Sequence, residues 1–162
     1  GGLSFMEAFG LLVLVIAIII AAAFVFFKWF KKPTVEDLGL HYGEKMLFDD
    51  DSGSVELPAG SDTEPMTSVF LRVTNKRIVI GLGGKRKHLL KFVIYYESVP
   101  GKSSGAAGKK GYISFTTEMK NISFIGDNAV RIEPAATRGV DVPEWLQIKT
   151  NHIGYYREAF RL

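Results

Sequence analysis

The sequence predicts a transmembrane helix followed by a mainly-β domain, an antiparallel sandwich or barrel that a C-terminal helix caps. Three observations carry this prediction: an uncharged apolar run, a series of short apolar runs at regular spacing, and an amphipathic pattern near the C-terminal end. Short alternating runs divided by turn residues are typical of antiparallel sandwiches and barrels. We expect an anchor with its basic flank at residues 1–32, a linker at 33–43 and a β-domain at 44–162.

The apolar run AFGLLVLVIAIIIAAAFVFF occupies residues 8–27. A helix rises about 1.5 Å per residue, so this run spans about 30 Å, the thickness of the hydrocarbon core of a lipid bilayer. It also lacks the polar face that a surface helix of a globular protein shows. A cleaved signal peptide is the alternative, but it begins with a basic leader, and GGLSFME contains no base. The sequence favours a signal anchor.

The flanks of this run predict its orientation. Lys28, Lys31 and Lys32 follow the run, whereas only Glu7 precedes it. Because positive charge stays on the cytoplasmic side, we expect the N-terminus outside a plasma or inner membrane and the β-domain in the cytoplasm. The absence of cysteine fits a reducing compartment. Trp29 among these lysines indicates an interfacial anchor, although a plain stop-transfer flank explains the same residues.

Small side chains within the run are candidates for helix packing. Gly10, Ala17 and Ala21 are small, and Ala17 and Ala21 lie four residues apart, on one helix face. Small residues let a second membrane helix approach closely. Ordinary alanine content of an apolar helix is the alternative explanation.

After the run the pattern changes to strands. Pro33 ends the helix because proline lacks a backbone N–H and disfavours helix at the preceding residue. Asn, Gly and Asp residues then mark turns between apolar runs, and DDDSG (49–53) marks the first of them. The predicted strands are 46–48, 69–73, 77–82, 89–96, 112–117, 122–126 and 129–134.

The last segment predicts a single amphipathic helix. Asp141 and Glu144 have the spacing of a capping box. Apolar residues then recur at steps of three and four from Trp145 to Phe160, which gives one apolar stripe. Gly154 weakens this helix by about 1 kcal/mol relative to alanine. We expect the helix to cover one end or face of the β-structure.

Three stretches carry a resemblance to a known family. GEKMLFDD (43–50), FLRVTNKRIVI (70–80) and KFVIYYESV (91–99) resemble bacterial pleckstrin-homology-like (PH-like) and GRAM-like domains. The resemblance covers about residues 43–160, and the closing helix belongs to it. It implies a noncatalytic module that binds lipids, peptides or other proteins. The loop KSSGAAGKK (102–110) and the acidic insertion at 51–65 depart from the family pattern.

Basic residues around the TNKR stretch are the candidate contacts for an anionic ligand or a partner. Ten bases stand against one acid in residues 68–110, whereas nine acids stand against one base in 33–67. The predicted strand 77–82 separates two basic turns by about 20 Å, which argues against a single pocket. Solvated, lysine-rich turns are the alternative. The candidates are Lys76 and Arg77 in the first turn, and Lys85, Arg86 and Lys87 with Lys91 in the second.

Other motifs do not support catalysis or a cofactor. GLGGKRK lacks the spacing and the following helix of a phosphate-binding loop, and DDDSG lacks the ligand pattern of a calcium loop. The three histidines are far apart in sequence, and no nucleophile motif is present. A net charge of +3 does not by itself indicate nucleic acid. We expect no catalytic, metal or cofactor-binding residue and no nucleic-acid partner.

These observations favour a noncatalytic, membrane-tethered adaptor. Besides the lipid bilayer, its partners would be membrane or cytoplasmic proteins, or anionic lipids at the membrane surface. The alternative is a structural accessory subunit that its transmembrane helix holds in a larger membrane complex.

Overall fold

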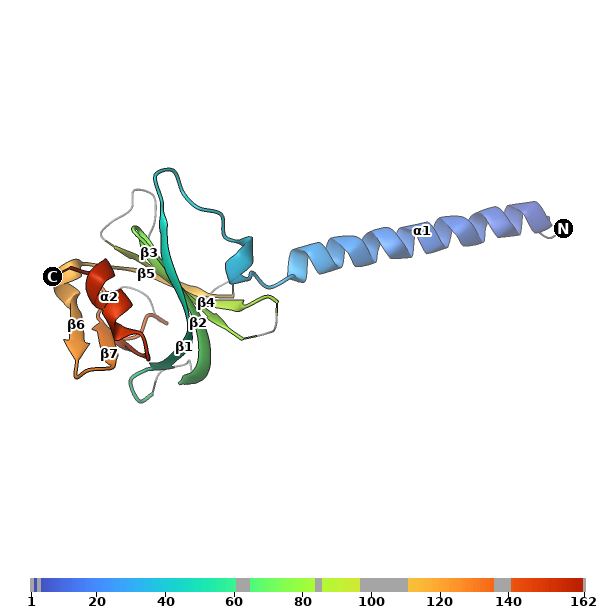
Figure 1. The fold of residues 1–162 in the computed structure, drawn as a ribbon. Helices are drawn as coiled ribbons and strands as arrows, with labels where there is room; N and C mark the ends of the chain where they lie inside the picture. The colour runs from blue at the N-terminus through green and yellow to red at the C-terminus, as the bar shows by residue number, and fades with distance from the viewer. Residues whose placement is uncertain are drawn as a thin grey trace. The chain divides into compact units, whose positions relative to one another are not determined.

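The chain forms two compact units, residues Gly1–Lys31 and Lys32–Leu162. The structure is a computed structural model, and it describes residue 2 and residues 4–60, 65–83, 86–96, 111–135 and 141–161. Figure 1 shows the N-terminal unit as one long helix and the second unit as a strongly curved sheet with a short helix. Each unit is considered by itself.

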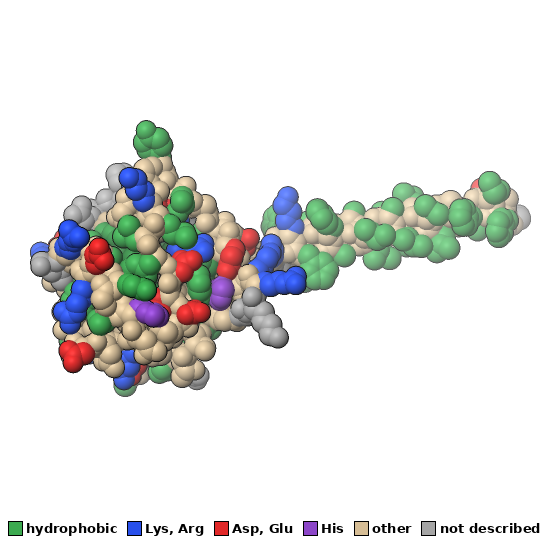
Figure 2. All heavy atoms as spheres, in the orientation of Figure 1, with side chains coloured by type: hydrophobic (Ala, Val, Ile, Leu, Met, Phe, Trp, Pro, Cys, Tyr) green, Lys and Arg blue, Asp and Glu red, His purple; other side chains and the backbone are tan. Residues whose placement is uncertain are grey.

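The N-terminal unit is the helix α1 (Phe5–Phe30). Its first turn is capped reciprocally, since Ser4 Oγ accepts from the Glu7 amide at 3.2 Å and Glu7 accepts from the Ser4 amide. Its most apolar window has a mean hydropathy of 3.2. Figure 2 shows hydrophobic side chains along the whole helix. The helix is long and apolar enough to cross a membrane, and it contains the predicted run 8–27.

The second unit is built on one eight-stranded sheet in the order β5-β4-β3-β2-β1-β8-β7-β6. Neighbouring strands are antiparallel except β4 and β5, which are parallel, so the prediction of a wholly antiparallel structure is wrong at this pair. The chain between these two strands, residues 97–112, has the length that a parallel crossover requires. The strands are β1 (Met46–Glu56), β2 (Met66–Thr74), β3 (Arg77–Leu82), β4 (Leu89–Tyr96), β5 (Ile113–Thr117), β6 (Ile122–Ile125), β7 (Ala129–Ile132) and β8 (Leu146–Lys149).

Apolar side chains cover both faces of β3 and β4. The main hydrophobic core includes Ile78, Ile80 and Phe92, and a second, smaller cluster includes Val79 and Val93. Because successive side chains of a strand point to opposite faces, a strand buried on both faces reads as a continuous apolar run. This explains why the bounds of β3 and β4 agree with the predicted strands 77–82 and 89–96.

The segment before β1 covers the second cluster. Thr34 forms a β-bridge with Leu89, and the 3₁₀-helix η1 (Val35–Asp37) follows it directly. Val35 is buried against β3 at Gly81, where a Cβ atom would lie 2.5 Å from a Val35 methyl group. Glycine at this position therefore allows the segment to pack on the outer face of the sheet.

The prediction that the first strand ends at DDDSG is wrong, because β1 continues through this sequence to Glu56. The carboxylate of Asp50 is buried and accepts hydrogen bonds from the hydroxyls of Ser52, Thr150 and Tyr156. These bonds satisfy a charge that the sequence pattern assigns to a solvated turn. Residues 51–56 of the predicted acidic insertion are thus part of the sheet, and residues 54–56 pair with β8.

The predicted long C-terminal helix is also wrong in its first half. Residues 146–149 form strand β8 between β1 and β7, and the helix α2 is confined to Ile153–Ala159. Trp145 and Ile148 lie three residues apart, as on one face of a helix, whereas the buried Leu146 and Ile148 alternate as in a strand, and the segment pairs with both β1 and β7. Tyr156 and Phe160 of the closing segment lie in the main core, so a short C-terminal helix does pack against the sheet, as expected.

The sheet remains open, since β5 and β6 at its two edges do not pair with each other. Two hydrogen bonds nevertheless connect β5 to the chain that follows β7. The Ala135 amide donates to the Thr116 carbonyl, and the Thr117 hydroxyl donates to the Glu133 carbonyl, both at 2.8 Å. The two edges are therefore held near each other at one corner.

Candidate functional site

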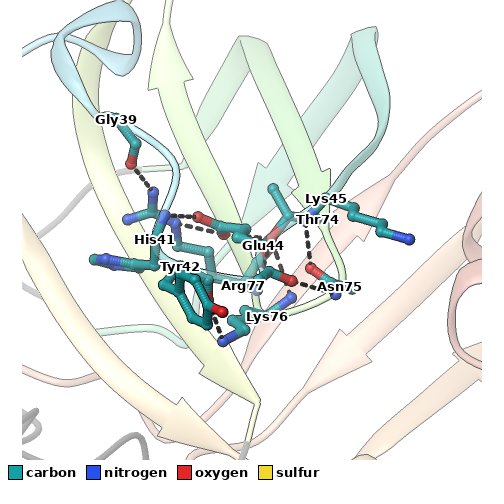
Figure 3. Close-up of polar contacts among 10 residues, drawn as sticks. Gly39, His41, Tyr42, Glu44, Lys45, Thr74, Asn75, Lys76 and Arg77 are labelled. Atoms are coloured by element: carbon teal, nitrogen blue, oxygen red, sulfur yellow. Dashed lines mark hydrogen bonds and ion pairs between the residues drawn. The ribbon is translucent and has the colours of Figure 1, made fainter.

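Residues 39–45 and the turn between β2 and β3 interlock at one end of the sheet, as Figure 3 shows. Asn75 in this turn accepts from the Lys45 amide at 2.7 Å and donates from its side-chain amide to the Gly43 carbonyl at 3.2 Å. The Lys76 ammonium donates to the Tyr42 carbonyl at 2.9 Å. We call this pair of segments the tip loop (residues 39–45 and 74–77).

A buried ion pair joins the two segments of the tip loop (Figure 3). Arg77 Nε lies 2.9 Å from Glu44 Oε2, and Arg77 Nη2 donates to the Gly39 carbonyl at 2.7 Å. Burial by itself would raise the pKa of Glu44, but hydrogen bonds from the Thr74 hydroxyl and the His41 amide, with the Arg77 charge, keep that pKa below its usual value. Glu44 stays ionised, and the loop is fixed at both of its ends.

The tip loop presents one aromatic side chain wholly to solvent. Tyr42 is 100% exposed, and Gly43 after it has a φ of 75°, a conformation that glycine adopts without strain. Lys76 contacts Tyr42, Lys45 follows it three residues later in the loop, and neither lysine forms an ion pair within the part of the chain that the structure describes. The loop thus combines a fixed backbone, an aromatic ring and two positive charges.

An apolar groove of about 650 Å³ lies between the start of β1 and α2. The register shift between Met46 and Phe48 inserts Leu47 as an extra residue in β1, and both Leu47 and Phe48 line the groove. The Phe48 ring packs on that of Tyr155 with centroids 5.4 Å apart. The other lining residues are Glu158, Ala159 and Arg161.

The opposite end of β3 carries the second basic turn. The chain joins the sheet here: the Leu90 amide donates to the Pro33 carbonyl at 3.0 Å, and the Val35 amide donates to the His88 carbonyl at 2.8 Å. His88 also pairs with Glu36 and stacks on Phe70. These contacts place the turn around residues 86–87 next to the point where residues 32–34 meet the sheet.

The structure thus separates the basic residues singled out in the sequence into two groups, at opposite ends of β3. Lys76 belongs to the tip loop, but the Arg77 guanidinium is buried against Glu44 and faces no solvent. Arg86 and Lys87 are exposed in the second turn, Lys91 is half-buried in β4, and Lys85 lies outside the described residues. The KSSGAAGKK loop lies outside them as well.

The candidates in the N-terminal unit all lie on or just after α1. Lys28 and Trp29 fall in its last turn, and Lys31 follows its end, with Lys32 the first residue of the second unit. Ala21 lines a shallow apolar groove on the helix surface, whereas Gly10 and Ala17 do not belong to it. Its other lining residues are Ile18, Ala22, Val25, Phe26 and Trp29.

Sequence reasoning missed Tyr42 and the groove beside α2. Tyr42 falls in the segment assigned to a linker, where the Tyr-Gly pair before Glu44 was the available signal for an ordered turn. The groove depends on the extra residue in β1, and no local sequence pattern predicts this register shift. Among the described residues no three His, Asp or Glu side chains gather in a way that would hold a metal ion.

Comparisons with protein-family models, with curated proteins and with solved structures gave no match for this chain.

Proposed function

We propose that this protein is a noncatalytic, membrane-tethered adaptor. In this proposal α1 spans a plasma or inner membrane with its N-terminus outside, and the β-domain, a PH/GRAM-like module, binds partner proteins in the cytoplasm. The basic flank of α1 supports the orientation, because positive charge stays on the cytoplasmic side. The exposed tip loop supports a binding role.

One observation carries the proposal: the tether and the tip loop meet opposite ends of β3. Only Lys31 and Lys32 separate the end of α1 from Pro33, whose carbonyl already bonds to β4. A membrane-spanning α1 would therefore keep this end of the sheet within about 10 Å of chain from the bilayer surface. The tip loop joins β3 at its other end, about 20 Å away along the strand. A tethered adaptor needs such a surface, free of the membrane.

The basic turn at residues 86–87, at the end of the sheet that follows α1, supports an interaction of the domain with the membrane surface. Arg86 and Lys87 are exposed there, and Lys32 lies in the adjoining chain. A base close to an anionic leaflet contributes about 1 kcal/mol, and this attraction falls off within a Debye length of about 10 Å. We infer that anionic lipids orient the domain, while α1 supplies membrane residence.

A structural accessory subunit is the second candidate, and the groove on α1 favours it. Ala21 and Ala22 leave room there for another membrane helix to approach closely. In that case association with a larger membrane complex would depend on α1, whereas an adaptor would bind through its β-domain.

Photo-crosslinking of the full chain in its native membrane separates the two candidates. A photoreactive phenylalanine analogue would replace Tyr42 and, as a matched control, the exposed Ile125 of β6. An adaptor gives a discrete adduct from position 42 and none from position 125, and the adduct persists when an unrelated spanning helix replaces α1. Loss of the adduct with that replacement indicates an accessory subunit. No adduct from position 42 with α1 intact contradicts partner binding at the tip.

A further inference from the structure

We propose that the tip loop and the groove beside α2 form one binding surface for a partner segment that carries acidic and apolar side chains. This inference rests on the proposed adaptor function and names the class of its partner. We call this surface the tip-groove surface: Tyr42, Lys45, Lys76, Met46, Leu47, Phe48 and Tyr155.

Exposed apolar side chains concentrate on this surface. Among the described residues of the second unit, six large hydrophobic residues are exposed: Leu40, Tyr42, Met46, Leu47, Ile125 and Tyr155. Four of the six belong to the tip-groove surface, and Leu40 lies in the tip loop next to it. A group of exposed apolar residues beside a polar rim marks an interaction site more often than scattered single residues do. Phe48 and Ala159 add partly buried apolar atoms to the groove.

The charges at the edge of this surface identify the partner. Lys45 and Lys76 form no ion pair in the described part of the chain, whereas Asp49 is occupied by Arg72 and Glu158 lies 3.7 Å from Arg161. Glu44, the acid closest in sequence to Tyr42, is buried and bonded to Arg77. The unpaired charges at the tip are thus positive, and an acidic segment complements them.

The tip is also ordered before any partner binds. Gly43, Lys45 and Asn75 are joined by backbone and amide hydrogen bonds, and Lys76 holds the Tyr42 carbonyl. A surface fixed in advance loses little conformational entropy on binding. A rigid tyrosine also supplies a large contact area for few rotatable bonds. Tyr42 therefore has the properties of an anchor residue at a protein interface.

Binding of peptide probes to the full chain, in nanodiscs of zwitterionic phosphatidylcholine, tests this inference. One probe alternates glutamate with leucine and phenylalanine, and the second has lysine in place of every glutamate. Fluorescence anisotropy of the labelled peptides measures their affinities. We expect the acidic probe to bind and the basic probe to bind at least tenfold more weakly, because like charges oppose each other at the tip.

Two variant pairs locate the site. Lys45→Glu combined with Lys76→Glu should weaken binding of the acidic probe at least about tenfold. Arg86→Glu combined with Lys87→Glu reverses as many charges at the opposite end of β3 and should leave the affinity for this probe unchanged. Tyr42→Ser weakens binding, and Ile125→Ser, which removes a side chain exposed elsewhere, does not. All six residues are exposed or half-exposed, so the free energy of unfolding in urea should hardly change.

Three results would overturn the inference. The first is equal binding of the acidic and basic probes, and the second is an equal loss of affinity for the acidic probe in the two charge-reversal pairs. The third is quenching of a label at position 42 by head-group quenchers, which would show that the bilayer occupies the surface. The first two results would leave a crosslinked protein partner at Tyr42 intact as support for the adaptor, whereas quenching at position 42 would also contradict a tip held away from the membrane. Loss of that crosslink with the peptide results unchanged would instead contradict the adaptor alone.

Discussion

The hydroxyl of Tyr156 in α2 donates a 2.9 Å hydrogen bond to the carboxylate of Asp50 in β1, 106 residues earlier in the chain. Both side chains are buried, and the Thr150 hydroxyl donates to the same oxygen of Asp50. This bond holds the helix that forms one wall of the groove against the strand that forms the other. The shape of the proposed binding surface therefore depends on a carboxylate in the core.

Tyr156→Phe should lower the free energy of unfolding by about 1.5–3 kcal/mol, because the hydroxyl donates to a buried charged group. Tyr155→Phe is the matched control. The Tyr155 ring is half exposed, and the Tyr155 hydroxyl forms no hydrogen bond with the described residues. The effect of this substitution on the free energy of unfolding should therefore stay within about 0.5 kcal/mol. Urea denaturation of both variants measures the difference. Equal effects of the two substitutions would show that the Asp50 bond does not stabilise α2.

Acid should destabilise the β-domain through the same carboxylate. Burial by itself would raise the pKa of Asp50, but hydrogen bonds from Thr150, Ser52 and Tyr156 lower it below its usual value. The folded-state pKa is thus lower than the unfolded one, so this stabilisation is complete above pH of about 4 and is lost as the pH falls through the folded-state pKa. Glu44 contributes with the same sign.

The free energy of unfolding, measured in urea between pH 2 and pH 7, checks this dependence. Asp50→Asn should be less stable at pH 7 and should lose less stability on acidification than the unchanged chain. Asp51→Asn, at the exposed neighbouring position, should keep the full slope. An identical slope in all three proteins would show that Asp50 does not contribute to the acid sensitivity of folding.

Gly81→Ala should destabilise the packing of residues 33–37 on the sheet. The added methyl group would meet a Val35 methyl at 2.5 Å and the Leu89 carbonyl at 3.2 Å, and such overpacking costs about 1–3 kcal/mol. Gly83→Ala, where no atom lies within 4 Å of the added carbon, is the matched control. Hydrogen exchange at the Val35 amide should accelerate in the first variant only. Unchanged exchange there would contradict a packed segment.

Arg77→Met should cost about 3–5 kcal/mol, because it leaves the buried Glu44 carboxylate without its cation. The double variant Arg77→Met/Glu44→Gln should recover part of this loss, since the uncompensated charge is then absent. A double-mutant cycle from thermal or urea unfolding measures the coupling. If Arg77→Met were as mild as an ordinary surface substitution, the ion pair would not fix the tip loop.

The bounds of a strand could be predicted from the sequence where its turn residues and its apolar pattern indicate the same structure. Asn75 and Gly83 lie in the turns that bound β3, and its apolar run is buried on both faces, so its bounds could be predicted. Asp50 shows the limit of such reasoning. An Asp-rich stretch indicates a turn unless hydroxyls from distant segments satisfy its charge, and Thr150 and Tyr156 lie a hundred residues away.

Strand β8 and the parallel pairing of β4 with β5 show the same limit. Trp145 and Ile148 have helical spacing whereas Leu146 and Ile148 have strand spacing, and pairing with both β1 and β7 selects the strand. At the candidate site, the basic character of Lys76 was visible in the sequence. The burial of Arg77 and the exposure of Tyr42 were not, because both follow from the contact of the turn at residues 74–77 with residues 39–45.

In the proposed function the domain holds its basic turn to the membrane and its tip away from it. The chain contains no cysteine, so a single fluorophore can be attached at Gly83→Cys or Lys45→Cys of the full protein in nanodiscs that contain head-group quenchers. We expect strong quenching at position 83, greater with anionic lipid and reduced by Arg86→Glu/Lys87→Glu, and weak quenching at position 45. Stronger quenching at position 45 than at position 83 would contradict this arrangement.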